Sequence, residues 1–181
     1  MPHITLQDGI PGIRSLVLFR PDTGKALYDL AQVLLRAPST LSSAERELIA
    51  AFVSNQNSCT FCCSSHAAAA RYLYKEDQSI VDVVLSEYLN APISDKLKCL
   101  LTIADHVRLD ARTVSEELVN NARIAGASDR DIHDTVLISA AFCMYNRYVD
   151  GLATFTPIEK QVYEQMGERM GTIGYVVPTN N

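Results

Sequence analysis

Two consecutive helices joined by a very short turn are the feature that most constrains this fold. Ser42 and Glu45 form an S-x-x-E capping box, which marks a helix start. Residues 48–53 are apolar on every side of that helix, so this part is expected to be buried all round. The polar break at 54–58 is rich in turn-forming residues, and a second helix with four consecutive alanines follows over residues 59–74. We expect an antiparallel helical hairpin.

The rest of the chain continues with helical signals and shows no alternating strand pattern with hairpin turns. Thr113 with Glu116 gives another capping-box pattern, and Gly126 is well placed to end that helix. Pro157 favours a helix start. The fold is expected to be all-α, with further helices over residues 23–36, 79–88, 94–109, 113–126, 128–152 and 157–170.

The two ends of the chain differ from this helical middle. Residues 1–22 contain three prolines and no helical period, so we expect an extended N-terminal arm docked on the body or on another subunit. Residues 23–170 are expected to form a single helical domain. Residues 171–181 are expected to be an extended, peripheral tail.

Composition and charge restrict the classes of function. The 181 residues suit one domain with a sizeable core, and the net charge of −5, without clustered Lys and Arg, argues against a nucleic-acid partner. There is no run of about 18 apolar residues that would span a membrane, and the N-terminus lacks an export signal. Five cysteines without a regular framework are, in a reducing cytosol, catalytic, metal-binding or buried residues. We expect a cytoplasmic protein.

Two cysteines and a histidine share one face of the second hairpin helix. Cys59, Cys62 and His66 have the spacing i, i+3 and i+7, which places them on one side within about two turns. The helix start favours a thiolate, and His66 is one turn after Cys62, within reach as a base. The second thiol of a C-x-x-C pair can resolve a sulfenic acid into a disulfide. This pattern predicts thiol redox chemistry.

Glu47 is the candidate partner of this face. It lies about 10 Å from the end of the first hairpin helix at 1.5 Å per residue, and His66 lies about as far into the second. The two side chains should therefore face each other across the hairpin. A partly buried carboxylate beside an imidazole can orient it or relay a proton. From spacing alone, a solvent-exposed Glu47 paired with Arg46 or Lys75 is equally compatible.

The same residues resemble a known signature, that of the alkyl hydroperoxidase D-like (AhpD-like) branch of the carboxymuconolactone decarboxylase superfamily. Residues 145–153, Tyr-Asn-Arg-Tyr-Val-Asp-Gly-Leu-Ala, resemble the late helix of its peroxidase-related members, and the resemblance covers roughly residues 20–160. The motif fixes four residue types at set spacings, namely Glu47, then eleven residues, then Cys59-x-x-Cys62-x-x-x-His66.

The resemblance implies a compact all-helical bundle and a cofactor-free, metal-free peroxidase that assembles as a homo-oligomer, a trimer or a hexamer. It implies that Cys62 attacks the hydroperoxide, that Cys59 resolves the product, and that His66 and Glu47 form the proton relay. An external dithiol would reduce the disulfide. The sequence departs from alkyl hydroperoxidase D at Phe61, where that protein carries a histidine, and Cys63 is an extra thiol.

Other functions stay open at this stage. Cys, Cys and His are also zinc ligands, so a redox-sensing or metal-holding binding module is one alternative. A lactone-decarboxylating lyase is another, although that reaction has no need of two adjacent thiols. Three polar residues on the long late helix could line a cleft or an interface, and the sequence does not choose between these roles for Asn146, Arg147 and Asp150.

Overall fold

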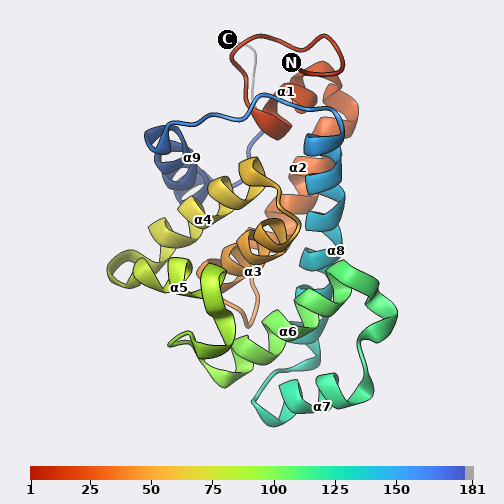
Figure 1. The fold of residues 1–181 in the computed structure, drawn as a ribbon, viewed down its shortest axis with the longest axis vertical. Coiled ribbons are helices and arrows are strands. Elements are labelled where there is room, and N and C mark those ends of the chain that lie inside the picture. The colour runs from red at the N-terminus through yellow and green to blue at the C-terminus, as the bar shows by residue number, and fades with distance from the viewer. Residues whose placement is uncertain (178–181) are drawn as a thin grey trace.

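The computed structural model describes residues 1–177 and is all-α, as predicted (Figure 1). Three short 3₁₀ turns at Lys75–Asp77, Tyr88–Asn90 and Ala111–Thr113 connect some of the helices. The nine α-helices of the described chain are α1 Gly12–Phe19, α2 Pro21–Arg36, α3 Ser43–Gln56, α4 Thr60–Tyr74, α5 Ser79–Glu87, α6 Asp95–Asp110, α7 Glu116–Ile124, α8 Asp129–Gly151 and α9 Lys160–Ile173.

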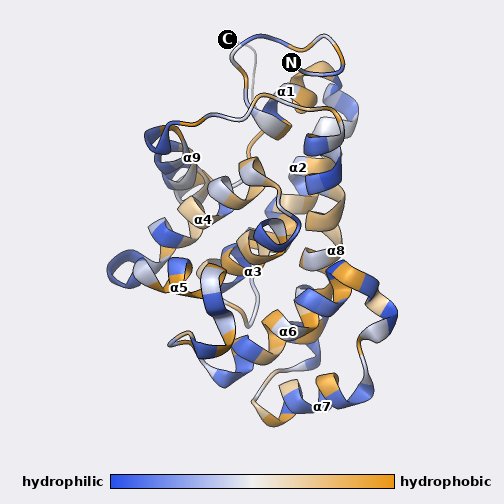
Figure 2. Ribbon diagram, in the orientation of Figure 1, coloured by the Kyte–Doolittle hydropathy of each residue, from blue (hydrophilic) through white to orange (hydrophobic). Residues whose placement is uncertain are grey.

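The predicted hairpin is present as α3 and α4 and forms the centre of the molecule. Ser42 and Glu45 make the reciprocal capping box at the start of α3. Residues 48–53 are completely buried, as their apolar character on all sides predicted. Helix α3 packs against α4, α6 and α8, and Figure 1 shows it surrounded by its neighbours. Figure 2 shows hydrophobic residues along the middle of α3 and hydrophilic ones at its end, whereas the peripheral α9 is mostly hydrophilic.

Helix α9 packs directly on the alanine-rich helix α4, and small residues allow this close approach. A Cβ atom built on Gly167 of α9 would lie only 2.5 Å from the backbone carbon of Ala68. Side chains therefore cannot separate the two helices at this point, and the backbones themselves are in contact. Through this contact, α4 fixes the position of α9 and of residues 174–177 that follow it.

The extended arm predicted for residues 1–22 is wrong in its second half. Gly12–Phe19 forms α1, and α2 already begins at Pro21. Helix α1 is only eight residues long, too short to show a clear period, and it forms because Leu16 and Val17 are buried against the body. The first eleven residues do lack a helix. They dock on the body of the same chain, where the His3 amide donates to the Leu152 carbonyl.

The prediction of an extended, peripheral tail from residue 171 is also wrong. Helix α9 begins at Lys160 instead of Pro157 and continues to Ile173, so its start lies later and its end lies beyond the predicted ones. Gly174, at φ +72°, then turns the chain back onto the body. Residues 178–181 of the predicted tail lie outside the described part of the chain.

One predicted helix cap is displaced. Ser115, and not Thr113, caps α7 by accepting a hydrogen bond from the Leu118 amide. Gly126 follows α7 at φ +95°, the conformation expected of a residue that ends a helix. In the part of the chain that is described, no helix is both long and apolar enough to cross a membrane.

Replacing Gly167 with alanine should destabilise the fold, although alanine is the better helix former. The added methyl group overlaps the backbone of Ala68, which has no flexible end to move aside. We expect a loss of about 1–3 kcal/mol in the free energy of unfolding, measured by urea denaturation. Gly151→Ala is the matched control, because nothing lies within 4 Å of its added methyl group. Equal stability of the two variants would contradict the close approach of α4 and α9.

Candidate active site

The α3–α4 hairpin brings Glu47 and His66 together, as the sequence predicted. His66 Nδ1 lies 2.7 Å from Glu47 Oε2, and the two side chains are 12% and 0% exposed, respectively. The exposed Glu47 that spacing alone had allowed, paired with Arg46 or Lys75, does not occur. Because a buried carboxylate beside an imidazole nitrogen accepts its N–H, Nδ1 carries a proton and Nε2 is left to face other groups.

Glu47 also binds two residues that sequence reasoning missed. Its other oxygen, Oε1, accepts hydrogen bonds from Arg36 Nη2 at 2.5 Å and from Tyr175 Oη at 2.6 Å. Burial alone would raise the pKa of Glu47, but His66, Arg36 and Tyr175 together outweigh it and lower that pKa below 4.5. The carboxylate is therefore ionised and holds donors on both oxygens.

Tyr175 comes from the segment after α9 and covers the imidazole of His66. The two rings are stacked, with an interplanar angle of 13° and centroids 6.1 Å apart. The Tyr175 amide donates to Gln32 Oε1 at 2.7 Å, which anchors the segment to α2. Burial and the Glu47 charge raise the pKa of Tyr175 well above 10, so its hydroxyl stays protonated and acts as the donor.

Arg36, the last residue of α2, joins the same cluster from the other side. Its guanidinium lies 5.2 Å from the centre of the Tyr175 ring, a cation–π arrangement, and it donates to the Met170 carbonyl near the end of α9. Four segments therefore converge on Glu47: the end of α2, α3, α4 and the chain after α9. No local sequence signal marks Arg36 or Tyr175, since both contacts depend on how distant helices pack.

The cysteine pair lies at the N-terminus of α4. Cys59 is the N-cap residue and is fully buried, and Cys62, in the first turn, is 4% exposed. The hydrogen bond from Cys59 to Cys62 raises the pKa of Cys59 far above its ordinary value, and burial raises it further. Cys59 thus keeps its proton. The unpaired N–H groups of the helix start favour negative charge at the sulfur of Cys62.

Cys62 and His66 line one small apolar cavity of about 40 Å³, whose walls include Tyr28, Phe142 and Tyr175. A neighbouring cavity of about 70 Å³ reaches His66 from the side of α9, with Met166 and Met170 among its lining residues. The space beside Cys62 is therefore small and bordered mostly by apolar and aromatic side chains.

The two departures from the family pattern have clear places in the structure. The Phe61 ring fills the position of the missing side chain of Gly12, where a Cβ atom would lie 2.0 Å away, and it packs beside Tyr163. Phe61 therefore joins α1 to α4 instead of supplying a second imidazole. Burial raises the pKa of Cys63 to about 11, which keeps this extra thiol protonated and weakly nucleophilic.

The three polar residues of the late helix α8 form a second polar region beside the cysteines. Asp150 Oδ1 lies 3.3 Å from Cys59 Sγ, whereas Asn146 binds Ser54 and Asn57. Arg147 is exposed and donates to the carbonyl of its own helix at Cys143. A hollow of about 360 Å³ is bordered by all three and by Asn57 and Gly151.

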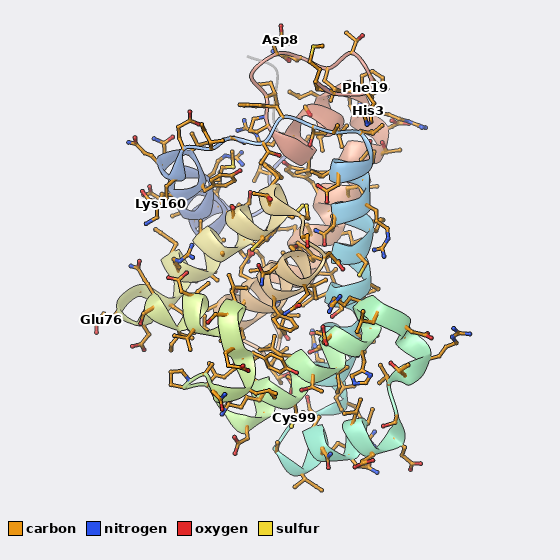
Figure 3. All side chains as sticks on the ribbon, viewed as in Figure 1. His3, Asp8, Phe19, Glu76, Cys99 and Lys160 are labelled. Carbon is orange, nitrogen blue, oxygen red and sulfur yellow. The ribbon has the colours of Figure 1, made fainter. Side chains whose placement is uncertain are left out.

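The remaining cysteines are not part of this arrangement. All five cysteines are free, and Cys143 only accepts a long contact from Asn57. Cys99 belongs to α6, at the opposite end of the molecule from His3 and Phe19 (Figure 3). Within residues 1–177, no group of three or more His, Cys, Asp or Glu side chains is placed to hold a metal ion.

Comparison with known proteins connects this geometry to a family. Residues 21–89, which contain the whole hairpin, match the carboxymuconolactone decarboxylase family. No curated protein sequence matches the chain.

Among solved structures, the fold resembles the alkylhydroperoxidase AhpD core of an uncharacterised peroxidase-related protein from Ralstonia eutropha JMP134. That match has a TM-score of 0.78 and 26% identity and covers 88% of this chain and 82% of the other. An uncharacterised peroxidase-related protein from Silicibacter sp. TM1040 gives 0.77 and 27%, covering 86% and 79%. A protein of unknown function from Agrobacterium tumefaciens, at 0.71 and 20% with 88% and 100% covered, shares the fold.

The family match includes every residue of the Glu47, Cys59, Cys62 and His66 constellation, and the solved structures reproduce the helical arrangement around it. Residues 21–89 therefore match the carboxymuconolactone decarboxylase family, and the surrounding fold is similar to structures of AhpD-like, peroxidase-related proteins.

Proposed function

We propose that this protein is a cysteine-based peroxidase that reduces hydroperoxides through the Cys59–Cys62 pair. The observation that carries the proposal is the ionised, fully buried Glu47 holding His66 beside a hydrogen-bonded thiol pair at a helix start. A purely structural helix start has no need of a buried carboxylate with three donors, because burying such a charge is costly.

The two cysteines have different roles in this proposal. Cys59 keeps its proton, so Cys62 is the thiolate that attacks the distal oxygen of the hydroperoxide. The S–O bond forms as the O–O bond breaks, which leaves a sulfenic acid on Cys62 and an alkoxide that takes up a proton to become an alcohol. The sulfur is oxidised and the peroxide is reduced.

His66 moves the proton in this step. Its Nδ1–H is fixed by Glu47, so Nε2 is the nitrogen that takes the Cys62 proton and returns it to the leaving alkoxide. Glu47 orients the ring and stabilises the imidazolium form. Because Arg36 and Tyr175 also share its charge, Glu47 acts as an electrostatic anchor and is a weak base.

Resolution and reduction complete the cycle. Cys59 condenses with the sulfenic acid to give a disulfide and water, and an external dithiol reduces that disulfide. The small apolar cavity beside Cys62 favours a small organic hydroperoxide as the substrate. Assembly as a homo-oligomer, a trimer or a hexamer, and a cytoplasmic location remain part of the proposal. Both are expected from the resemblance and from the sequence.

Oxidation of the purified, reduced protein with one equivalent of cumene hydroperoxide should remove two of its five thiols. Peptide mapping should place the new disulfide between Cys59 and Cys62. Cys62→Ser should abolish hydroperoxide consumption, and Cys59→Ser should stop at a sulfenic acid that dimedone traps. Cys63→Ser is the control and should react at about the wild-type rate. Undiminished consumption by Cys62→Ser would refute the assignment.

Glu47→Gln should destabilise the protein by about 3 kcal/mol at neutral pH, because Arg36 loses its buried partner. The folded-state pKa of Glu47 is lowered, so its stabilising contribution is present above about pH 4.5 and disappears as the pH falls through the folded-state value. The difference in unfolding free energy between wild type and Glu47→Gln should therefore shrink on acidification.

Urea denaturation at a series of pH values measures this difference. Glu164→Gln is the matched control, since Glu164 is 58% exposed and pairs only loosely with Lys160. A constant gap between wild type and Glu47→Gln down to strongly acidic pH would show that Glu47 is not ionised in the folded protein.

A further inference from the structure

Cys59 has a hydrogen-bond acceptor besides its partner thiol. Asp150 Oδ1, from the last turn of α8, lies 3.3 Å from Cys59 Sγ. Cys59 is fully buried, whereas Asp150 is exposed and lines the hollow of about 360 Å³. The carboxylate therefore touches the buried sulfur at one end and solvent at the other.

The thiol proton of Cys59 has two possible acceptors. Before oxidation, the sulfur of Cys62 is one acceptor and the carboxylate of Asp150 is the other. Attack on a hydroperoxide converts Cys62 into a sulfenic acid, which removes the negative charge from its sulfur. From that moment the carboxylate is the stronger acceptor of the two.

We propose that Asp150 is a catalytic residue that accepts the proton of Cys59 when Cys59 closes the disulfide. This inference rests on the proposed peroxidase function and adds a second base to it. The Cys59 sulfur attacks the Cys62 sulfur, the S–S bond forms and the S–OH bond breaks. The thiol proton passes to Asp150, and the departing hydroxide gains a proton from solvent and leaves as water.

The environment of Cys59 explains why this step needs a base. Both the bond to Cys62 and burial hold the Cys59 thiol protonated, so its thiolate is rare without help. His66 is already held by Glu47 on the cavity side of Cys62. Asp150 touches the Cys59 sulfur itself and, being exposed, can release its proton to water. In this proposal, His66 takes the proton of Cys62 and Asp150 takes the proton of Cys59.

The reaction with 4,4′-dithiodipyridine tests this assignment without any hydroperoxide. In a Cys63→Ser, Cys99→Ser, Cys143→Ser background, the first thiopyridone released reports attack by Cys62. The second reports attack by Cys59 on the mixed disulfide. Asp150→Asn should slow the second release by on the order of 100-fold, the usual contribution of general base catalysis, and should change the first by less than about twofold.

Two controls separate base catalysis from a structural effect. Asp29→Asn removes one exposed carboxylate of α2 that pairs with Lys25, and it should leave both releases at their original rates. For Asp150→Ala, added formate should increase the rate of the second thiopyridone release at least several-fold, because the hollow is open to a small carboxylate. Sodium chloride at equal ionic strength should give no recovery.

The outcomes are distinct. Equal slowing of both releases, no slowing at all, or failure of formate to restore Asp150→Ala would each overturn the role of Asp150. Because the probe is a disulfide and no hydroperoxide is present, this experiment tests the role of Asp150 independently of the proposed peroxidase function. A wild-type protein that shows both releases but never consumes hydroperoxide would refute the proposed function while still deciding how Cys59 loses its proton.

Discussion

The buried carboxylate of Glu47 is the interaction on which the rest of the site depends. An ionised group removed from water is stable only with full compensation, and Glu47 obtains it from His66, Arg36 and Tyr175. Each donor comes from a different segment, so the charge can be satisfied only when α2, α4 and the chain after α9 are all in place. The hairpin carries Cys59, Cys62 and His66, and the buried carboxylate ties the position of His66 to the packing of all these segments.

A consequence of this arrangement is that the two thiols lie in unlike surroundings. Cys62 shares a small apolar cavity with the imidazole of His66, whereas Cys59 contacts an exposed carboxylate on α8. Oxidation and resolution place opposite demands on a thiol pair: the first sulfur must be ionised at rest, and the second must ionise only afterwards. In the proposed mechanism, these two demands fall on thiols that have different neighbours.

The sequence was sufficient for the hairpin and its four residues because their signals are local. Caps, an apolar run and a short turn determine how Glu47 and His66 meet, and all of this lies within about 30 residues. Arg36 and Tyr175 could not be predicted, since their contacts arise from helices far apart in the chain. The errors at residues 12–22 and after 171 have a related cause. Helix α1 and the Gly174 turn are stabilised by packing on the body rather than by their own periodicity.

The contact between Gly167 and Ala68 has a mechanical consequence for the chemistry. Gly167 lies eight residues before Tyr175, so the close approach of α9 to α4 helps to set the position of the segment that carries Tyr175 over His66. A methyl group at Gly167 would push α9 away from α4, and we expect it to shift Tyr175 relative to the imidazole without altering the side chains of the site. The spacing between two helices is thus coupled, through the chain that follows α9, to a hydrogen bond of the buried carboxylate of Glu47.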